Sequence, residues 1–192
     1  FAALALAGTK AAGLELSESE LSVLARRGSG SAARSIFGGY VRMDGGKLED
    51  GTDCHASRIA PPEHWDLHCF VAQTQFGAKK VASTDGMEET QRSSPLYQAW
   101  VDTVDNDIQS AMQAIEARDF EKLAVVAEGS CLAMHASALA ARPAVIYWNS
   151  ATLSLMHQVR AMREHDGLNV FFTIDAGPHV KVFCEAKDAT EV

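Results

Sequence analysis

A segment rich in glycine and serine, followed by an arginine, contains the first residues that could bind an anion. Residues 27–34 read Arg-Gly-Ser-Gly-Ser-Ala-Ala-Arg. Glycines allow successive backbone N–H groups to turn inward, Ser29 and Ser31 add hydroxyl donors, and Arg34 offers a planar fork suited to a phosphate or a carboxylate. The segment matches neither the Walker pattern nor the dinucleotide fingerprint. Its pattern leaves two interpretations open, an anion site that includes Gly30 and a solvated linker.

A carboxylate at the end of an apolar run is the second candidate. Asp175 follows Phe-Phe-Thr-Ile at 171–174 and precedes Ala-Gly-Pro at 176–178. A carboxylate in this position can face a pocket, and its small neighbours let a ligand approach the backbone. Aspartate also begins turns and caps helices. Taken alone, these residues favour the capping role.

A polar segment over 77–93 is the third candidate, and it starts with the basic pair Lys79 and Lys80. A surface loop with at most a turn of helix is expected here, and a lid or phosphate-contacting loop is the alternative. Ser94 is explained as a helix N-cap, because Pro95 follows it at the first helical position. A basic cluster could form from Arg26, Arg27, Arg34, Lys79, Lys80 and Arg92.

The cysteines and histidines do not predict a metal site. The pairs Cys54-His55 and His68-Cys69 lack the spacing of zinc ligands. The four cysteines are widely spaced and form no Cys-X-X-Cys pair, which is typical of free thiols in a reducing cytosol. His135 lies in a predicted helix and is expected to be a core or polar-network residue.

The elements that must position these residues follow from periodicity and from turn signals. Ser17 and Glu20 have the spacing of a capping box, and Gly-Ser-Gly-Ser ends the helix that they begin. Helices are predicted over 1–12, 17–27, 32–37, 94–115, 119 onward and 143–162. Strands are predicted over 40–43, 67–72, 169–174 and 180–183, and a short strand or extended segment over 50–58. The strand over 67–72 is expected to be buried, and 44–46 is expected to form a tight turn.

Composition excludes several classes of protein. The chain has 192 residues, of which 47% are hydrophobic and 22% charged, and its formal net charge is -8. These values exclude collagen-like, disordered and disulfide-scaffold proteins, and no apolar run approaches the roughly 20 residues that a membrane helix needs. The acidic balance argues against general nucleic-acid binding. Pro61 and Pro62 mark a domain boundary, and the second half is expected to be an α+β layer pair with helices on one face of a sheet.

Several motifs together resemble one family. The segments ARRGSGSAARSIFGGYV, KKVASTDGM, RSSPLYQAW, MHASALAARP and FFTIDAGPHVKVF occur in the order of the mevalonate diphosphate decarboxylases, which belong to the GHMP kinase superfamily. The resemblance covers essentially the whole chain. It implies a GHMP-kinase-like α+β fold, with residues 1–65 as the trailing part of the N-terminal domain and 66–192 as a ferredoxin-like C-terminal domain. The active site is expected in the cleft between them.

The resemblance also implies a reaction. The family phosphorylates the 3-hydroxyl of mevalonate 5-diphosphate with ATP and Mg²⁺, and loss of phosphate and CO₂ then gives isopentenyl diphosphate. It implies a cytoplasmic enzyme, commonly a homodimer, that binds neither nucleic acid nor membrane. The residues that match the family's site are Asp175 and Arg34 as catalytic groups, and Ser29, Gly30, Ser31 and Ser94 as substrate-binding groups.

Two departures from the family pattern leave alternatives open. The family reads Asp-Ala-Gly-Pro-Asn, whereas this chain has His179 in place of the asparagine. The family's ATP-phosphate loop precedes the region that begins here at Phe1, so it is expected upstream or in a companion segment. The alternatives are a decarboxylase of mevalonate monophosphate, a relative that stops at 3-phosphorylation, and a non-catalytic fragment.

Overall fold

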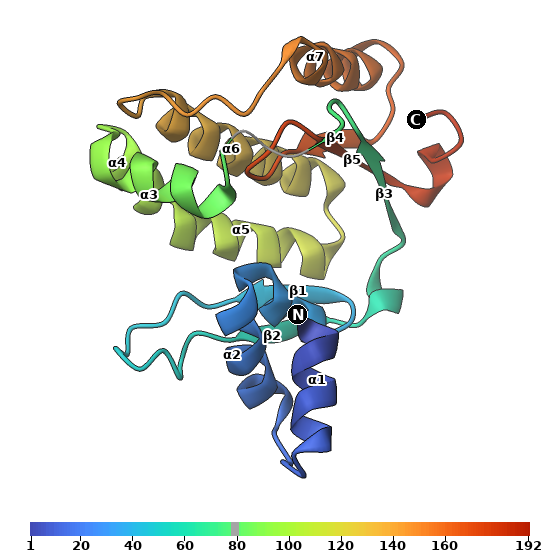
Figure 1. Ribbon diagram of the computed structural model, residues 1–192. Coiled ribbons are helices and arrows are strands. Elements are labelled where there is room, and N and C mark those ends of the chain that lie inside the picture. Colours follow the sequence, from blue (N-terminus) through green and yellow to red (C-terminus); the bar gives the residue numbers. More distant parts are fainter. Residues whose placement is uncertain (78–80) are drawn as a thin grey trace. The chain divides into compact units, whose positions relative to one another are not determined.

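The computed structural model describes residues 1–77 and 81–192 (Figure 1). The chain divides into two compact units, Phe1–Trp65 and Asp66–Val192. Each unit contains its own antiparallel sheet. Among the described residues, no helix is both long enough and apolar enough to cross a membrane.

The first unit begins with two helices that the sequence predicts. Helix α1 (Ala2–Ala11) is followed by Gly13, whose φ of 68° lies in the left-handed region that glycine favours. Helix α2 (Glu18–Gly28) begins with the predicted capping box, in which the Ser17 hydroxyl accepts from the Glu20 N–H and the Glu20 carboxylate accepts from the Ser17 N–H. A seven-residue 3-10 helix, η1 (Gly30–Ile36), follows directly.

The sheet of the first unit is a β-hairpin whose two short strands are joined by a long connection. Strand β1 (Tyr40–Met43) pairs antiparallel with β2 (Ala56–Ala60), and a short 3-10 turn, η2 (Pro62–His64), closes the unit. The predicted tight turn over 44–46 is wrong, because the connection runs from residue 44 to residue 55. The Asp53 carboxylate accepts from the backbone N–H of Lys47 at 2.6 Å and thereby folds this longer excursion.

The second unit is a three-stranded sheet with helices packed against it. Its strands are β3 (Leu67–Ala72), β4 (Val170–Thr173) and β5 (Val180–Glu185), in the order β3-β5-β4, and both pairings are antiparallel. A short 3-10 turn, η3 (Ala186–Asp188), follows β5. Its helices are α3 (Ser83–Ser93), α4 (Tyr97–Val101), α5 (Val104–Ala117), α6 (Phe120–Leu139) and α7 (Ser150–His165).

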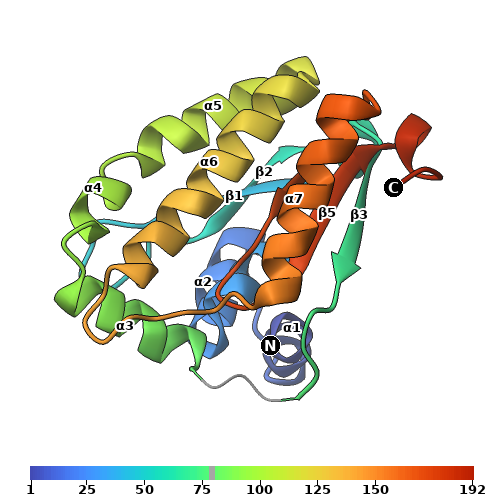
Figure 2. The ribbon, with the colours of Figure 1, turned by 90° about the horizontal axis from the view of Figure 1, so that it is seen from above.

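Helices α6 and α7 cover one face of this sheet, as the sequence predicts. Phe172 of β4 and Val182 of β5 form a buried cluster with Cys131 of α6 and Val159 of α7. Figure 2 shows α5 running beside α6. The α+β character expected from the alternation of apolar runs is therefore confirmed.

Strand β3 corrects one expectation. The apolar run over 67–72 was expected to be buried, yet four of its six residues are exposed, and only Ala72 packs against the core. Phe70 is 40% and Val71 56% exposed. The reason is position, since β3 is an edge strand of the described sheet and the helices α6 and α7 pack mainly over β4 and β5. An apolar run alone does not distinguish an edge strand from a central one.

Helix α3 corrects a second expectation, because it occupies most of the segment predicted to be a loop. Its buried face consists of Gly86 and Thr90, and a side chain at Gly86 would collide with the Tyr147 hydroxyl. The Thr90 hydroxyl donates to the Gly86 carbonyl at 2.7 Å. A buried face made of glycine and threonine carries no apolar periodicity, so the helix reads as polar sequence. Lys79 and Lys80 of the same predicted loop lie outside the described residues.

Two further helices have boundaries that differ from those expected. The helix predicted over 94–115 is divided into α4 and α5, and at their junction the Thr103 hydroxyl donates to the Trp100 carbonyl. The helix predicted from 143 begins only at residue 150. Asn149 sets that start, since its side chain accepts from the Thr152 N–H at 2.9 Å.

A buried ion pair ties α6, α7 and β4 together. Glu128 is only 7% exposed and accepts from both terminal nitrogens of Arg163, at 2.9 and 3.1 Å. The same carboxylate accepts from the Phe172 N–H at 3.3 Å, and Arg163 donates to the Val170 carbonyl at 3.1 Å. The pair therefore satisfies two backbone groups of β4 as well as its own charges.

Removing one charge of this pair is expected to destabilise the fold. Glu128→Gln leaves Arg163 partly buried without its counter-charge, so we expect a loss of about 2–3 kcal/mol in the free energy of unfolding. Urea unfolding of the 192-residue chain measures this loss. Glu121→Gln, an exposed position on the same helix, is the matched control and should cost no more than about 0.5 kcal/mol. Equal effects of the two changes would contradict a structural role for the pair.

Candidate functional site

Asp175 lies in the turn that joins β4 to β5, and its carboxylate is paired. Lys181 Nζ lies 2.5 Å from Asp175 Oδ1, the aspartate side chain being 72% exposed and the lysine side chain 22% exposed. Asp175 thus presents a carboxylate at the surface of the unit. It does not cap a helix, so the capping role that the residue types favoured is wrong. The Gly177 N–H donates to the Asp175 carbonyl at 2.6 Å and closes the turn.

Sequence reasoning missed Lys181. Its signal was a single charged residue in the apolar run over 180–184. Lys181 of β5 lies opposite Thr173 of β4 in the strand register, and Thr173 is two residues before Asp175 in the chain. Only the register of the β4–β5 pair shows that the two side chains meet, and register is not readable from composition.

Helix α6 holds the backbone just before Asp175. Cys131 Sγ accepts from the Ile174 N–H at 3.2 Å and lies 3.4 Å from the Ile174 carbonyl oxygen, to which it donates. His135 Nε2 lies 3.3 Å from the same carbonyl oxygen, so that nitrogen carries the proton of the bond. His135 is 2% exposed, and its ring packs at a tilt against Trp148 with the ring centroids 4.7 Å apart, which confirms the predicted core or polar-network role.

Burial keeps both α6 groups uncharged. Desolvation lowers the pKa of His135, and hydrogen bonds to Ile174 and Asp175 oppose this only in part. Desolvation likewise raises the pKa of the Cys131 thiol. A neutral imidazole and a protonated thiol hold the Ile174 carbonyl without adding charge beside Asp175.

The other end of the turn is held by three further elements. The Pro178 carbonyl accepts from the Thr74 and Thr152 hydroxyls, each at 2.7 Å. The Ser83 hydroxyl donates to the Ala176 carbonyl at 3.4 Å. His179 Nδ1 accepts from the Thr74 N–H at 3.3 Å. An asparagine oxygen can accept in the same way, so the departure at His179 retains an acceptor in the turn.

Ser94 is placed at the other end of α3 from this turn. It ends α3 and does not begin a helix, because its N–H donates to the Thr90 carbonyl and its hydroxyl accepts from the Leu96 N–H at 3.2 Å. At 1.5 Å per residue, α3 separates Ser94 from Ser83 by about 16 Å. The N-cap interpretation of Ser94 is therefore wrong, and its role at a substrate stays a prediction.

In the first unit, the candidate anion-binding residues share one turn. The hydroxyl oxygens of Ser29 and Ser31 lie 3.2 Å apart, and the position of a side chain at Gly30 is open space. Arg34 is exposed, with Nη1 3.9 Å from Met43 Sδ. The structure thus brings the Ser29 and Ser31 hydroxyls together, while the Arg34 guanidinium lies against Met43, and the binding role of these residues stays a prediction. The short 3-10 helix behind them is too short to act as an N-terminal anion site.

A buried serine fixes this turn from below. Ser22 of α2 has no exposed surface, donates to the Ala33 carbonyl at 3.1 Å and accepts from the Ala56 N–H at 2.9 Å. One hydroxyl therefore joins α2, η1 and β2. Parts of the proposed basic cluster are engaged elsewhere, since Arg26 donates to the Gly51 carbonyl and Arg92 pairs with Glu89.

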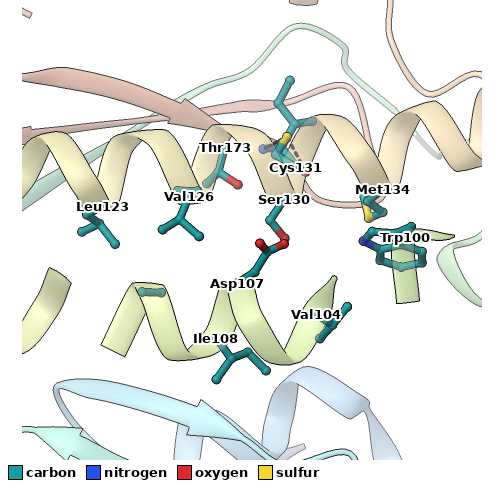
Figure 3. A pocket seen from close by; sticks show the side chains of 13 residues that line it. Trp100, Val104, Asp107, Ile108, Leu123, Val126, Ser130, Cys131, Met134 and Thr173 are labelled. Atoms are coloured by element: carbon teal, nitrogen blue, oxygen red, sulfur yellow. Dashed lines mark hydrogen bonds between the residues drawn. The ribbon is translucent and has the colours of Figure 1, made fainter. Parts of the chain in front are cut away.

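A cavity of about 360 Å³ lies between α5 and α6, behind the Asp175 turn. Figure 3 shows Asp107 of α5 and Ser130 of α6 pointing toward one another within it. Thr173 and Ile174 form its wall on the side of the sheet. Its lining is mostly apolar, and it contains none of the predicted site residues.

The described part of the chain contains no preformed cluster of metal ligands. Residues 1–77 and 81–192 contain no group of three or more His, Cys, Asp or Glu side chains that could hold one. Mg²⁺ is commonly bound through one or two carboxylates, with substrate phosphates and water as its other ligands. Such a site needs no cluster of three protein ligands.

Comparison with known proteins gives matches along both units. Residues 69–192 match the mevalonate 5-diphosphate decarboxylase C-terminal domain, and residues 1–56 match the diphosphomevalonate decarboxylase-like N-terminal domain. A diphosphomevalonate decarboxylase from Ganoderma lucidum is 36% identical over 199 residues, covering 100% of this chain and 50% of the relative. The chain spans about half the length of the curated relatives it matches.

Solved structures agree in fold. Mevalonate diphosphate decarboxylase from Staphylococcus aureus has a TM-score of 0.92 and 37% identity, with 99% of this chain and 57% of that protein covered. A protein called MDDEF, solved in complex with MVAPP, AMPPCP and magnesium, has a TM-score of 0.86 and 39% identity over 93% of this chain and 54% of its own.

These likenesses and the two-unit architecture define an α+β protein with a GHMP-kinase-like fold. The matched family model spans more than half of the chain and includes the Asp175 turn. Within that class, the chain belongs to the mevalonate 5-diphosphate decarboxylase family.

The buried His135 is expected to make stability depend on pH. Because burial lowers the pKa of His135 below its ordinary 6.5, the unfolded chain takes up the proton first as the pH falls. Its contribution to stability is complete above pH 6.5 and declines below it. We expect urea unfolding to show a larger loss of stability between about pH 7 and pH 5 for the natural chain than for His135→Gln, which keeps a donor but does not titrate. Parallel losses in the two proteins would show that His135 is not the group responsible.

Proposed function

We propose that this chain is part of a diphosphomevalonate decarboxylase that converts mevalonate 5-diphosphate to isopentenyl diphosphate through 3-phosphorylation. The observation that carries the proposal is the exposed Asp175 carboxylate, paired with Lys181 on a turn whose backbone is held by several elements. MDDEF, the solved relative bound to MVAPP, AMPPCP and magnesium, supports substrate and nucleotide of this class. ATP would supply the phosphoryl group, with Mg²⁺ as its counter-ion.

In this proposal Asp175 accepts or orients the proton of the substrate's 3-hydroxyl. Phosphoryl transfer depends on positioning and charge stabilisation, and the hydroxyl proton leaves late, so a well-placed carboxylate is sufficient as the base. The exposed carboxylate can reach a bound substrate, and its fixed backbone keeps the oxygen in place. Phosphate at the tertiary carbon then becomes the leaving group for decarboxylation.

The turn over residues 29–34 is proposed to bind the charged end of the substrate. The paired hydroxyls of Ser29 and Ser31 and the open space at Gly30 leave room for a phosphate oxygen, and exposed Arg34 can pair with a phosphate or carboxylate. Ser94 is proposed as a further phosphate contact on the strength of the family motif.

We assign Phe1–Trp65 to the trailing part of a GHMP kinase N-terminal domain and Asp66–Val192 to its C-terminal domain. The surface of α1 supports the first assignment, because this helix is mostly alanine and leucine and yet only Thr9 is buried. Leu4 is 69% and Leu6 43% exposed. Helices of this kind are buried in complete domains, so we propose that a further segment covers α1 in the active protein. The four cysteines are unpaired, which supports a cytoplasmic location, and a homodimer is the proposed assembly.

Asp175→Asn tests the proposal in a full-length enzyme that contains this chain. We expect kcat to fall at least about 10²-fold, because an amide cannot accept the proton, while substrate KM changes less than about threefold. Release of ADP and of ¹⁴CO₂ is measured with mevalonate 5-diphosphate and with the monophosphate. Asp166→Asn, an exposed aspartate after α7, is the matched control.

The products separate the alternatives. CO₂ and ADP in equal amounts with the diphosphate support the decarboxylase, and ADP without CO₂ identifies a 3-kinase. Turnover only with the monophosphate would identify mevalonate monophosphate as the substrate. No turnover by the natural full-length protein favours a non-catalytic role. Near-normal kcat in Asp175→Asn removes that residue from the reaction.

Arg34→Ala is expected to weaken substrate binding. Loss of a charge-assisted pair of about 1.5–3 kcal/mol corresponds to a KM increase of about 10- to 150-fold. Arg34→Lys should recover only part of this, because an ammonium group does not make the planar paired contact. Arg58→Ala, an exposed arginine on β2, provides the comparison in the same steady-state assay. An unchanged KM in Arg34→Ala would mean that the turn does not contact the substrate.

A further inference from the structure

We propose that Lys181 is a positioning residue for Asp175, holding carboxylate oxygen Oδ1 so that the other oxygen faces the substrate's hydroxyl. The inference rests on the proposed function, because that function supplies the substrate hydroxyl with which the Asp175 carboxylate interacts. The contact itself is direct, with Lys181 Nζ 2.5 Å from Oδ1.

The strand register explains how the Lys181 side chain reaches the Asp175 carboxylate. Val71, Lys181 and Thr173 lie opposite one another on β3, β5 and β4. Phe172 and Val182 belong to the core under α6 and α7, so their neighbours Thr173 and Lys181 face the opposite side of the sheet. Asp175, two residues beyond Thr173, is the diagonal neighbour of Lys181. A diagonal separation of about 7–8 Å suits the four-carbon stem of lysine.

The two side chains differ in exposure in the way that positioning requires. The lysine is 22% exposed, so its stem is largely covered, whereas the aspartate is 72% exposed. A carboxylate this open to water rotates freely unless a partner holds it. Pairs between two exposed charges seldom hold a geometry, but a lysine whose side chain is largely covered has fewer alternative rotamers. Lys181 therefore supplies the fixed end of the pair.

The backbone leaves the side chain as the only adjustable part of Asp175. Cys131 and His135 hold the carbonyl before it, and the Gly177 N–H holds its own carbonyl. With the main chain restrained on both sides, the remaining freedom is rotation about the side-chain bonds. An ion pair at one oxygen restricts that rotation, while the 72% exposed side chain keeps the carboxylate accessible to a substrate.

The test compares Lys181→Met and Lys181→Arg in the full-length enzyme that contains this chain. We expect Lys181→Met to lower kcat about 10²-fold with KM within about threefold, because misplaced reacting groups cost rate and not binding. Lys181→Arg, which keeps the charge, should recover kcat to within about tenfold of the natural enzyme. Lys187→Met removes another lysine–carboxylate pair of the same unit, to Glu185, and should leave both constants unchanged.

A double mutant separates positioning from other roles. If Lys181 acts through Asp175, Lys181→Met should have little further effect once Asp175 is asparagine. A raised KM with unchanged kcat would overturn the proposal in favour of a phosphate contact, and additive losses or unchanged kinetics would also overturn it. Lys181→Gln, which retains a polar end, replaces Lys181→Met if melting temperature shows that the latter does not fold.

The outcome for Asp175→Asn keeps the two proposals distinct. An inactive Asp175→Asn beside a fully active Lys181→Met removes only the lysine's role. An active Asp175→Asn removes the carboxylate's role in the reaction and the lysine's role with it.

Discussion

Between Ile174 and Pro178 the backbone carbonyls are engaged by groups from widely separated parts of the second unit. Cys131 and His135 of α6 hold Ile174, Ser83 of α3 holds Ala176, and Thr74 and Thr152 hold Pro178. A buried carbonyl without a partner costs free energy, so these bonds restrict where each element can sit. The position of a single carboxylate thereby depends on the packing of the strand end after β3, of three helices and of the β4–β5 hairpin.

The first unit uses the same principle on a smaller scale. The Ser22 hydroxyl has no exposed surface and joins the backbones of η1 and β2 to α2. Glycine and serine alone would make the adjoining turn pliable, but the buried hydroxyl gives it a fixed base. In both units, small polar side chains inside the structure hold a surface turn whose exposed side chains are available to a ligand.

Sequence reasoning succeeded where the signal was local and failed where it depended on packing. The capping box at Ser17 and the strands around Asp175 follow from neighbouring residues, and the family motif marks the Asp175 turn. Helix α3 was missed because its buried face is Gly86 and Thr90, which carry no hydrophobic period. The Lys181 contact needed the strand register, and the exposure of β3 needed the strand order. These are properties of pairing between distant segments, which a single sequence does not display.

The order of elements along the chain has a consequence for how the protein is made. The partners of the Asp175 turn lie 43 residues away for Cys131, 93 for Ser83 and 104 for Thr74. Such distant contacts close large loops and slow the folding of a domain. During synthesis, α6 and α7 leave the ribosome before β4 and β5, so their apolar faces have no sheet to cover until the hairpin emerges. Over this interval the nascent unit exposes an apolar helical surface that is prone to aggregation. This is the stage of synthesis at which binding by a molecular chaperone would protect the chain most.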